Sequence, residues 1–287
     1  MKIDGRKIAE EIIERLKNKV VLNDQAPLEI KFLTGQAQGK ILPNKILAVV
    51  YVGENPASEA FIKQKKKVAE ELGVDFRIYR FSGEMSNDKL RAEVVRIARQ
   101  GAVGGVIVQL PLPEKFNRQK ILNAAPAEKD VDVLSEKAWG VFSLGRGAVL
   151  PPAVGVVEEI LLIFNFQLST SCVAVVGAGT PVGKPVAAWL SGKVKKLAIF
   201  DEGSDLGELS EYDLVVTGVG KGEIIKPEFL KEGASVIDFG YEGGRGDLDA
   251  SDESKLEKLA FWTPTPGGTG PILVAKLFEN FYKLNRN

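Results

Sequence analysis

Three glycines follow an apolar run of β-branched residues and precede a segment with helical periodicity. The run is Val173–Val176, and Gly177, Gly179 and Gly183 come after it. A strand, a glycine turn and a helix in this order bind phosphate groups, because glycine lets the backbone approach the ligand and the first N–H groups of the helix are unpaired. The spacing GxGxxxG therefore predicts a pyrophosphate site, although the same turn also serves as a plain strand-to-helix connection in parallel sheets.

Asp201 indicates a nucleotide rather than a simple phosphate. It comes directly after a second apolar run, Leu197–Phe200, and roughly 20 residues past the glycines, where a carboxylate accepts hydrogen bonds from a ribose. The alternative is that Asp201 caps the next turn and faces solvent.

Lys65 is the candidate acid–base group. On a helix from Ser58 to Leu72 it falls near the middle of an apolar stripe. The stripe contains Phe61, Ile62, Val68, Ala69 and Leu72. Such a lysine must extend to water, pair, or lose its proton, because a buried unpaired ammonium costs several kcal/mol. The helix follows the end of a strand, where open α/β sheets bind their ligands, so a functional role is favoured.

Two further polar sites follow apolar segments. Gln109 ends the run Gly104–Gln109 and is followed by Leu-Pro-Leu-Pro. It either caps the strand end or contacts a ligand. The loop Pro126–Asp132 carries two aspartates close together, which is also the composition of a solvated turn.

Composition restricts the possible chemistry. The chain has 287 residues, 38 basic and 38 acidic side chains, one cysteine and no histidine. The length favours two domains, and the balanced charge gives no reason to expect a nucleic acid or membrane partner. Without histidine, proton transfer near neutral pH falls to Lys, Asp, Glu or Tyr, and no metal site is expected. The single cysteine, Cys172, lies in a predicted strand, and because it has no second cysteine to pair with, an internal disulfide is excluded. The absence of a signal peptide and of an apolar span predicts a cytoplasmic protein.

Apolar periodicity predicts strands that alternate with helices, and so an α/β fold. The expected strands are Leu47–Val52, Val74–Phe81, Gly104–Gln109, Val173–Val176, Leu197–Phe200, Leu214–Thr217 and Ser235–Ile237. The expected helices cover residues 5–20, 58–72, 86–100 and 271–284. Residues 23–44 are interpreted as a hairpin or loop insertion, and residues 240–249 as an exposed loop without chemistry.

Five ordered motifs resemble the bifunctional methylenetetrahydrofolate dehydrogenase/methenyltetrahydrofolate cyclohydrolase family. The family patterns S-x-x-Y-V-x-x-K, VQLPLP, KDVDG, G-R-S-x-x-V-G-x-P and T-P-V-P-G-G-V-G-P match Ser58–Lys65, Val108–Pro113, Lys129–Val133, Gly177–Pro185 and Thr263–Pro271. The match extends over nearly the whole chain.

The resemblance implies a role for each matched residue. Lys65, Gln109 and Asp132 would be catalytic, and Phe61, Pro266, Gly267 and Gly268 would bind the folate. An aspartate suits a pterin, whose amino group and ring N–H form a paired donor edge. The cofactor-binding residues would be Gly177, Ala178, Gly179, Thr180, Val182, Gly183, Asp201, Gly218 and Gly220. The family also implies a homodimer.

Several polar groups of the family pattern are replaced here. The tyrosine is Phe61, the glycine after the second aspartate is Val133, and the family's Met-Thr near the C-terminus is Ile272-Leu273. The linker residues Pro152-Ala153 lack the family's threonine. Loss of the phenol predicts weakened hydrolysis.

The nucleotide site departs from the family pattern as well. Ala178-Gly179 replaces Arg-Ser, and Asp201-Glu202 replaces His-Ser. Donors to a ribose phosphate are therefore lost, so NAD is expected and NADP is less suited.

The resulting expectation is a two-domain α/β enzyme with folate bound between its domains. Residues 1–145, joined by a C-terminal helix over residues 271–287, would form the catalytic domain, and residues 146–270 a Rossmann-type domain. The enzyme would oxidise methylenetetrahydrofolate to methenyltetrahydrofolate and hydrolyse the product to formyltetrahydrofolate. The alternatives are a shikimate-type two-domain dehydrogenase and a binding protein for folate or nucleotide that has lost catalysis.

Overall fold

The computed structural model describes residues 1–25 and 45–286. Helix α1 runs from Gly5 to Gln25. The prediction of an insertion over residues 23–44 is therefore wrong for residues 23–25, which continue the helix, and residues 26–44 lie outside the described part of the chain.

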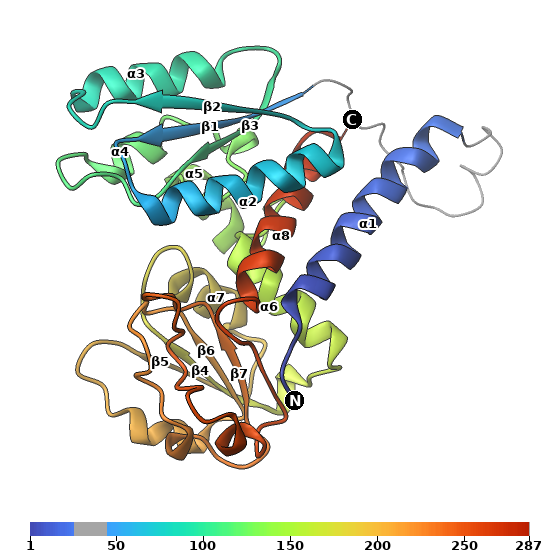
Figure 1. Cartoon of the computed structure of the whole chain (residues 1–287), viewed down its shortest axis with the longest axis vertical. Coiled ribbons are helices and arrows are strands. Elements are labelled where there is room, and N and C mark those ends of the chain that lie inside the picture. Colours follow the sequence, from blue (N-terminus) through green and yellow to red (C-terminus); the bar gives the residue numbers. More distant parts are fainter. Residues whose placement is uncertain (26–44, 287) are drawn as a thin grey trace. The chain divides into compact units, whose positions relative to one another are not determined.

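The chain divides into two compact units, each drawn in Figure 1. Unit 1 contains Met1–Ala9 and Pro151–Leu273, and unit 2 contains Glu10–Leu150 and Val274–Asn287. Helices α1 and α8 (Thr269–Leu284) each contribute residues to both units.

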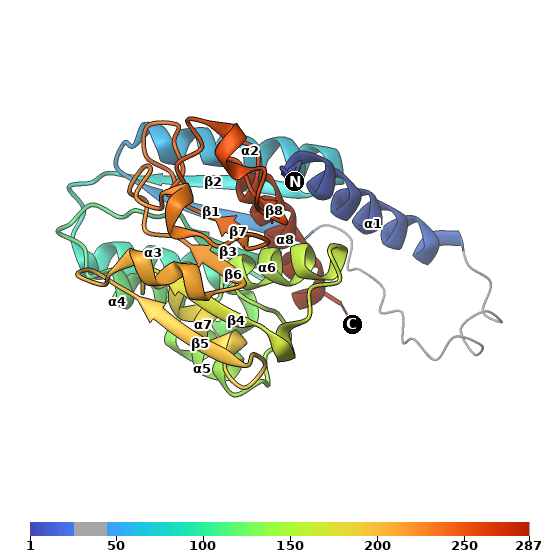
Figure 2. The same cartoon turned by 90° about the horizontal axis from the view of Figure 1, so that it is seen from below.

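Unit 2 is built on a parallel three-stranded sheet in the order β2-β1-β3. Figures 1 and 2 show helices α2 and α3 on opposite faces of this sheet. The elements are β1 (Ile46–Val52), α2 (Pro56–Leu72), β2 (Asp75–Phe81), α3 (Asn87–Ala98), β3 (Val103–Val108), α4 (Arg118–Leu122) and α5 (Glu136–Ser143). The central strand β1 is buried along its whole length, as expected for a continuous apolar run covered on both faces.

The C-terminal part of α8 belongs to unit 2. The side-chain amide of Asn280 donates to the carbonyls of Val131 (2.9 Å) and Leu150 (2.7 Å). Asn285 donates to the carbonyl of Gly104 in β3 at 3.1 Å. These bonds tie the end of the chain to the sheet and to the loop that carries Asp132.

Unit 1 is built on a parallel five-stranded sheet in the order β5-β4-β6-β7-β8, which Figure 2 shows. Its elements are α6 (Pro152–Ile163), β4 (Cys172–Val176), α7 (Gly183–Leu190), β5 (Lys196–Phe200), β6 (Leu214–Thr217), β7 (Ser235–Asp238) and β8 (Phe261–Trp262). Strand β4 pairs with β5 on one side and with β6 on the other, so the chain changes direction across the sheet at β4. Open α/β sheets bind ligands at the carboxyl ends of the strands at such a point.

The predicted α/β class and all seven predicted strands are confirmed, with bounds that differ by no more than two residues. Helix α6 was not predicted. Eight of its twelve residues are buried, including the consecutive run Pro152–Val157. Its polar residues are the adjacent Glu158 and Glu159, which are too few to show a helical period.

Candidate active site

Helix α2 carries Lys65 on its buried face. The helix is capped by Asn55, whose side chain accepts a hydrogen bond from the backbone N–H of Ser58 at 2.9 Å, and it ends at Gly73 in a left-handed conformation. Its buried residues are Ser58, Ile62, Lys65 and Ala69, which recur at helical spacing. The Lys65 side chain is therefore directed into the unit, and only 3% of the residue is exposed.

Gln109 and Phe61 contact the Lys65 ammonium. Lys65 Nζ donates to Gln109 Oε1 at 3.0 Å and lies 4.9 Å from the centre of the Phe61 ring. The Gln109 Nε2 group donates to the carbonyl of Leu110 at 2.7 Å. Because this bond fixes the amide at the end of β3, its oxygen is held toward the lysine. The predicted ligand-facing glutamine is thus a partner of Lys65, and the lysine does not extend to water.

Asp132 supplies the opposite charge. It is partly buried in the loop that follows the short helix Ala127–Lys129. Burial lowers the pKa of the Lys65 ammonium, and the nearby Asp132 carboxylate opposes that shift. Burial likewise raises the pKa of Asp132 to about 6, against the charge of Lys65. Both groups are therefore displaced toward their neutral forms, which is the condition for exchanging protons near neutrality.

The other aspartate of the loop has a structural role. Asp130 is 4% exposed, and its carboxylate accepts the backbone N–H of Ser135 at 2.7 Å, just before α5. Asp130 therefore stabilises the conformation of the loop that carries Asp132.

Val133 has a conformation that favours glycine. Its φ is +56° although it is β-branched and 3% exposed. A left-handed conformation costs an L-residue about 1–2 kcal/mol. The glycine of the family pattern would adopt this backbone conformation without strain, whereas the valine next to Asp132 adopts it with backbone strain.

Ser58, the serine of the matched motif Ser58–Lys65, is a polar residue of this cluster that was not predicted as a site residue. It is 3% exposed, and its hydroxyl donates to the carbonyl of Leu110 at 3.2 Å. The bond joins the first turn of α2 to the segment after β3, which carries Gln109. Its position seven residues before Lys65 on the same helix face was the available signal.

In unit 1 the glycine turn joins β4 to α7. Gly177 has a φ of +91°, and its N–H donates to the carbonyl of Phe200 at 2.7 Å. A Cβ at Gly183 would overlap the carbonyl of Gly177, so this glycine is required for the tight turn. Gly179 meets only Pro181 in its neighbourhood and has no such constraint. Helix α7 has no side-chain N-cap. Lys184 already donates its N–H to the carbonyl of Gly179 at 3.0 Å and Pro185 has no N–H, so Gly183 provides the N–H group for a phosphate at this helix start.

The remaining predicted cofactor residues follow the carboxyl ends of β5 and β6, the two strands beside β4. Asp201 is exposed directly after β5, and its backbone N–H donates to Ser204 Oγ at 3.0 Å. Gly218 follows β6, and a Cβ there would lie 2.7 Å from the Val182 side chain. Gly220 has a φ of +75°. The turn Gly177–Gly183, which contains Ala178 and Thr180, thus shares one sheet edge with Asp201, Gly218 and Gly220.

The predicted folate residues Pro266, Gly267 and Gly268 lie in unit 1, between β8 and α8. Gly267 has a φ of +98°, and a Cβ at Gly268 would overlap the carbonyl of Pro264. Both glycines are therefore needed by the local backbone. These residues belong to unit 1, whereas Phe61 and Lys65 belong to unit 2.

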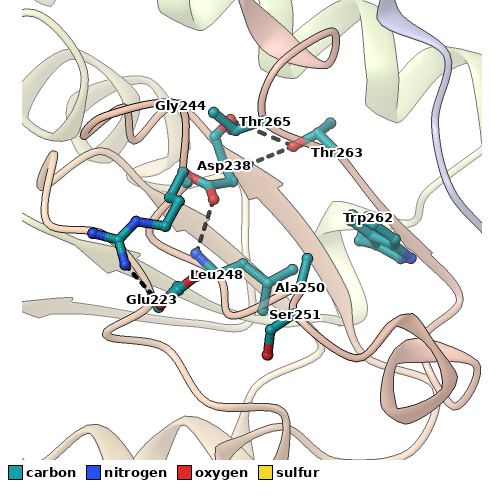
Figure 3. A pocket seen from close by; sticks show the side chains of 11 residues that line it. Glu223, Asp238, Gly244, Leu248, Ala250, Ser251, Trp262, Thr263 and Thr265 are labelled. Atoms are coloured by element: carbon teal, nitrogen blue, oxygen red, sulfur yellow. Dashed lines mark hydrogen bonds and ion pairs between the residues drawn. The ribbon is translucent and has the colours of Figure 1, made fainter.

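The expectation that residues 240–249 form an exposed loop is wrong for residues 246–248, which are buried, and agrees with the exposure of residues 241–243 and 245. Asp247 is 0% exposed and Leu248 is 3% exposed. A cavity of about 160 Å³ adjoins this segment in unit 1 and is lined by Asp238, Leu248 and Thr263 among others (Figure 3). None of the predicted site residues lines it.

Within residues 1–25 and 45–286 there is no group of three or more His, Cys, Asp or Glu placed to hold a metal ion. None of the helices in that part of the chain has the length and apolar character of a membrane span.

Comparison with known proteins identifies the family. Residues 3–132 match the family described as tetrahydrofolate dehydrogenase/cyclohydrolase, catalytic domain, and residues 151–287 match its NAD(P)-binding domain. The bifunctional protein FolD of Bacillus velezensis is 34% identical over 291 residues, which cover 99% of this chain and 97% of that protein.

Solved structures agree with this assignment. The bifunctional FolD methylenetetrahydrofolate dehydrogenase/cyclohydrolase of Campylobacter jejuni is 30% identical, with a TM-score of 0.85 over 99% of this chain and 98% of that one. The Trypanosoma brucei enzyme, complexed with NADP cofactor and inhibitor, is 26% identical, with a TM-score of 0.85 over 99% and 96% of the two chains. Shikimate 5-dehydrogenase of Listeria monocytogenes is 14% identical, with a TM-score of 0.51 over 84% and 93%, and shares the fold alone. The chain belongs to the tetrahydrofolate dehydrogenase/cyclohydrolase family.

Proposed function

We propose that this protein oxidises methylenetetrahydrofolate to methenyltetrahydrofolate with a nicotinamide nucleotide and hydrolyses the product to formyltetrahydrofolate. The observation that carries the proposal is the buried cluster of Lys65, Gln109 and Asp132, which occupies the matched motifs of the family. The distant likeness to a shikimate dehydrogenase concerns the fold alone and does not favour that alternative.

Lys65 is proposed as the proton acceptor or relay of the hydrolytic step. In that step a water oxygen bonds to the methenyl carbon and the water loses one proton, which gives a carbinolamine. A carbon–nitrogen bond then breaks while the remaining hydroxyl proton is transferred to the released nitrogen, which leaves the formyl group. A lysine whose pKa is lowered by burial has an accessible neutral amine that takes such a proton. Gln109 Oε1, at 3.0 Å from Lys65 Nζ, keeps the amine in place through the exchange.

Asp132 is proposed to bind the pterin. Its two oxygens accept the amino group and the adjacent ring N–H as a pair, which the ionised carboxylate does best. Because its pKa in the protein is raised to about 6, the carboxylate is mostly ionised at neutral pH and becomes protonated in mild acid. Folate affinity should therefore fall as the pH drops below about 6.

The residues of unit 1 fit a dinucleotide. Gly177 and Gly183 form a turn that a Cβ would obstruct, and the N–H of Gly183 at the start of α7 is proposed to donate to a pyrophosphate. When bound, the nicotinamide supplies the hydride acceptor for the oxidation. Asp201, exposed at the end of the neighbouring strand β5, is proposed to accept the ribose hydroxyls and to select NAD over NADP.

Three finer properties are also proposed. Phe61 supplies no hydroxyl beside Lys65 Nζ, so hydrolysis should be slower than oxidation. A homodimer is proposed from the family resemblance, and a cytoplasmic location from the composition. Sedimentation measurements test the homodimer, and cell fractionation tests the location.

The proposal is tested by incubating the protein with methylenetetrahydrofolate and either NAD or NADP. Methenyltetrahydrofolate and the reduced nucleotide should form in equal amounts, followed by formyltetrahydrofolate. Tight binding of folate and nucleotide without any turnover would identify a binding protein instead and overturn the proposal.

A further inference from the structure

A buried carboxylate lies beneath the turn that follows β6. Asp247 Oδ2 accepts the hydroxyl of Thr217 at 2.6 Å and the backbone N–H of Val219 at 2.7 Å. Asp247 Oδ1 accepts the backbone N–H groups of Gly220 at 2.9 Å and Lys221 at 3.0 Å. Each oxygen therefore has two donors, which saturates the carboxylate. Charge-assisted bonds of this kind are roughly twice as strong as neutral ones.

A second aspartate holds the segment that carries Asp247. Asp238, at the end of β7, accepts the backbone N–H groups of Gly240 at 2.6 Å and Leu248 at 2.9 Å, the latter drawn in Figure 3. A Cβ at Gly240 would overlap the Asp247 carboxylate, and a Cβ at Gly246 would overlap that of Asp238. The two glycines thus let both carboxylates lie against the backbone.

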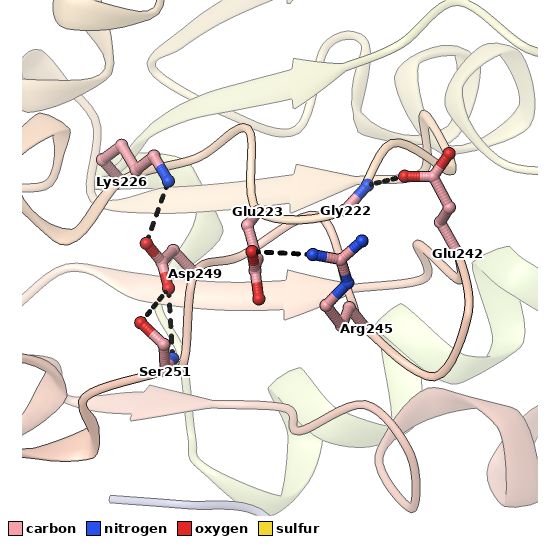
Figure 4. Close-up of polar contacts among 7 residues, drawn as sticks. All are labelled: Gly222, Glu223, Lys226, Glu242, Arg245, Asp249 and Ser251. Carbon is pink, nitrogen blue, oxygen red and sulfur yellow. Dashed lines mark hydrogen bonds and ion pairs between the residues drawn. The ribbon is translucent and has the colours of Figure 1, made fainter.

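The contacts around this pair are more exposed. Figure 4 shows the Glu242 carboxylate accepting the backbone N–H of Gly222 at 2.9 Å and an ion pair between Arg245 and Glu223 at 3.2 Å. Exposed ion pairs contribute little to stability. The buried Asp247 carboxylate is therefore the principal group that fixes the turn.

We infer that Asp247 is a positioning residue for the nicotinamide nucleotide, which it serves by fixing the backbone of the Gly218–Gly220 turn. The inference rests on the proposed function, because this turn lies at the carboxyl end of β6, beside the glycine turn that follows β4. Asp247 itself has no oxygen left for a ligand.

The N–H groups of the turn point at Asp247, so they do not bind the phosphates of the nucleotide. Consecutive backbone N–H groups of a turn form an anion site. Here the N–H groups of Val219, Gly220 and Lys221 are already occupied by Asp247. The turn therefore contacts the nucleotide with its remaining atoms, and the pyrophosphate is bound instead at the start of α7, where Gly183 provides the N–H group.

The test compares Asp247→Asn and Thr217→Val with Asp249→Asn in the full-length chain. An amide at position 247 must direct its NH₂ group at two donors, whichever way it is turned. Thr217→Val removes one donor and keeps the three N–H bonds. Asp249 is the matched control, because it lies two residues away and pairs with Lys226 at 3.0 Å rather than with the turn (Figure 4).

Two measurements separate positioning from general damage. The first is the dissociation constant of NAD without folate, together with KM for each substrate and kcat. Asp247→Asn should raise the NAD dissociation constant and KM about tenfold or more, Thr217→Val about two- to threefold, and both should leave kcat at saturating NAD and KM for folate nearly unchanged. Asp249→Asn should behave as the parent.

The second measurement is amide hydrogen exchange in the parent, which needs no variant to fold. The N–H groups of residues 219–221 should exchange at least about 100-fold slower than unprotected amides, although their turn is exposed. Fast exchange at these amides, or a folded Asp247→Asn that binds NAD as the parent does, would overturn the inference while leaving the proposed function intact. A parent that binds no nicotinamide nucleotide would overturn both.

Discussion

The buried carboxyl group of Asp238 should make the free energy of unfolding decrease as the pH rises toward neutrality. Burial raises the pKa of its carboxyl from the ordinary 3.8 to about 7, and the negative charge of Asp247 adds to the shift, while backbone N–H bonds oppose it. The folded protein therefore keeps a proton that the unfolded chain releases above about pH 4. Between these two values each rise in pH favours the unfolded state, and above about pH 7 the effect levels off.

The magnitude follows from the two pKa values. A shift from 3.8 to about 7 corresponds to about 4 kcal/mol in total, at about 1.4 kcal/mol per unit. Part of the change lies below pH 5 and the slope declines near pH 7. Between pH 5 and pH 8 the loss should be about 2–3 kcal/mol.

Asp238→Asn removes this titration. The variant has its own constant penalty, because its NH₂ group faces a backbone N–H, so the informative quantity is the pH dependence of the difference between parent and variant. Urea unfolding at pH 5, 6, 7 and 8 measures it, followed by a probe within unit 1. The stability of the parent relative to Asp238→Asn should fall by about 2–3 kcal/mol across this range.

Asp249→Asn is the control of opposite sign. The pKa of Asp249 is lowered to about 2, first by its bond to Ser251 and then by Lys226. Its stabilisation is therefore complete above pH 5, and the difference between parent and control should be constant from pH 5 to pH 8. A constant difference for Asp238→Asn as well would refute the argument that burial displaces the Asp238 titration.

Three further predictions concern the two sites. Phe61→Tyr places a hydroxyl beside Lys65 Nζ and should raise cyclohydrolase turnover, whereas the control Phe61→Leu should not. Turnover is measured by the absorbance of the methenyl substrate, and no gain with tyrosine would show that the missing phenol does not limit hydrolysis. The parent should prefer NAD over NADP in kcat/KM by about five- to tenfold, which is the effect of like charges about 4 Å apart at an exposed site. Asp201→Ser should lose most of this preference because its kcat/KM with NADP improves, whereas the control Asp205→Ser should keep the preference. Val133→Gly should destabilise unit 2 by about 1–2 kcal/mol less than Val131→Gly in urea unfolding, because only Val133 has a positive φ to relieve; equal costs would contradict the strain.

Features encoded by local patterns could be predicted from the sequence. The apolar runs of β1 and β4 show a strand without any knowledge of its neighbours, and the stripe around Lys65 shows that a charge is buried. The glycines of the β4–α7 turn were recognisable because their spacing reports a backbone requirement.

Features that depend on distant contacts could not be predicted. Asp247 is buried because it reaches Thr217, thirty residues earlier in the chain, and its own segment reads as a polar loop. The partner of Lys65 is set by the parallel pairing of β1 and β3, which brings Gln109 beside the middle of α2. The length of α1 was missed because its last turn, up to Gln25, ends in polar residues without helical periodicity.

The most direct test of the proposed active site is the rate of methenyltetrahydrofolate hydrolysis by Lys65→Met, with Lys67→Met as the exposed control on the same helix. Methionine keeps the length of the side chain and removes the buried ammonium, but it also leaves Gln109 Oε1 without its donor and Asp132 without its opposite charge. The variant should therefore be less stable than the parent, and its folding is checked by circular dichroism before the rates are compared. We expect hydrolysis to fall by at least about 100-fold in Lys65→Met and to remain at the parent rate in Lys67→Met. Near-normal hydrolysis by a folded Lys65→Met would contradict the assignment of Lys65 as the acid–base group.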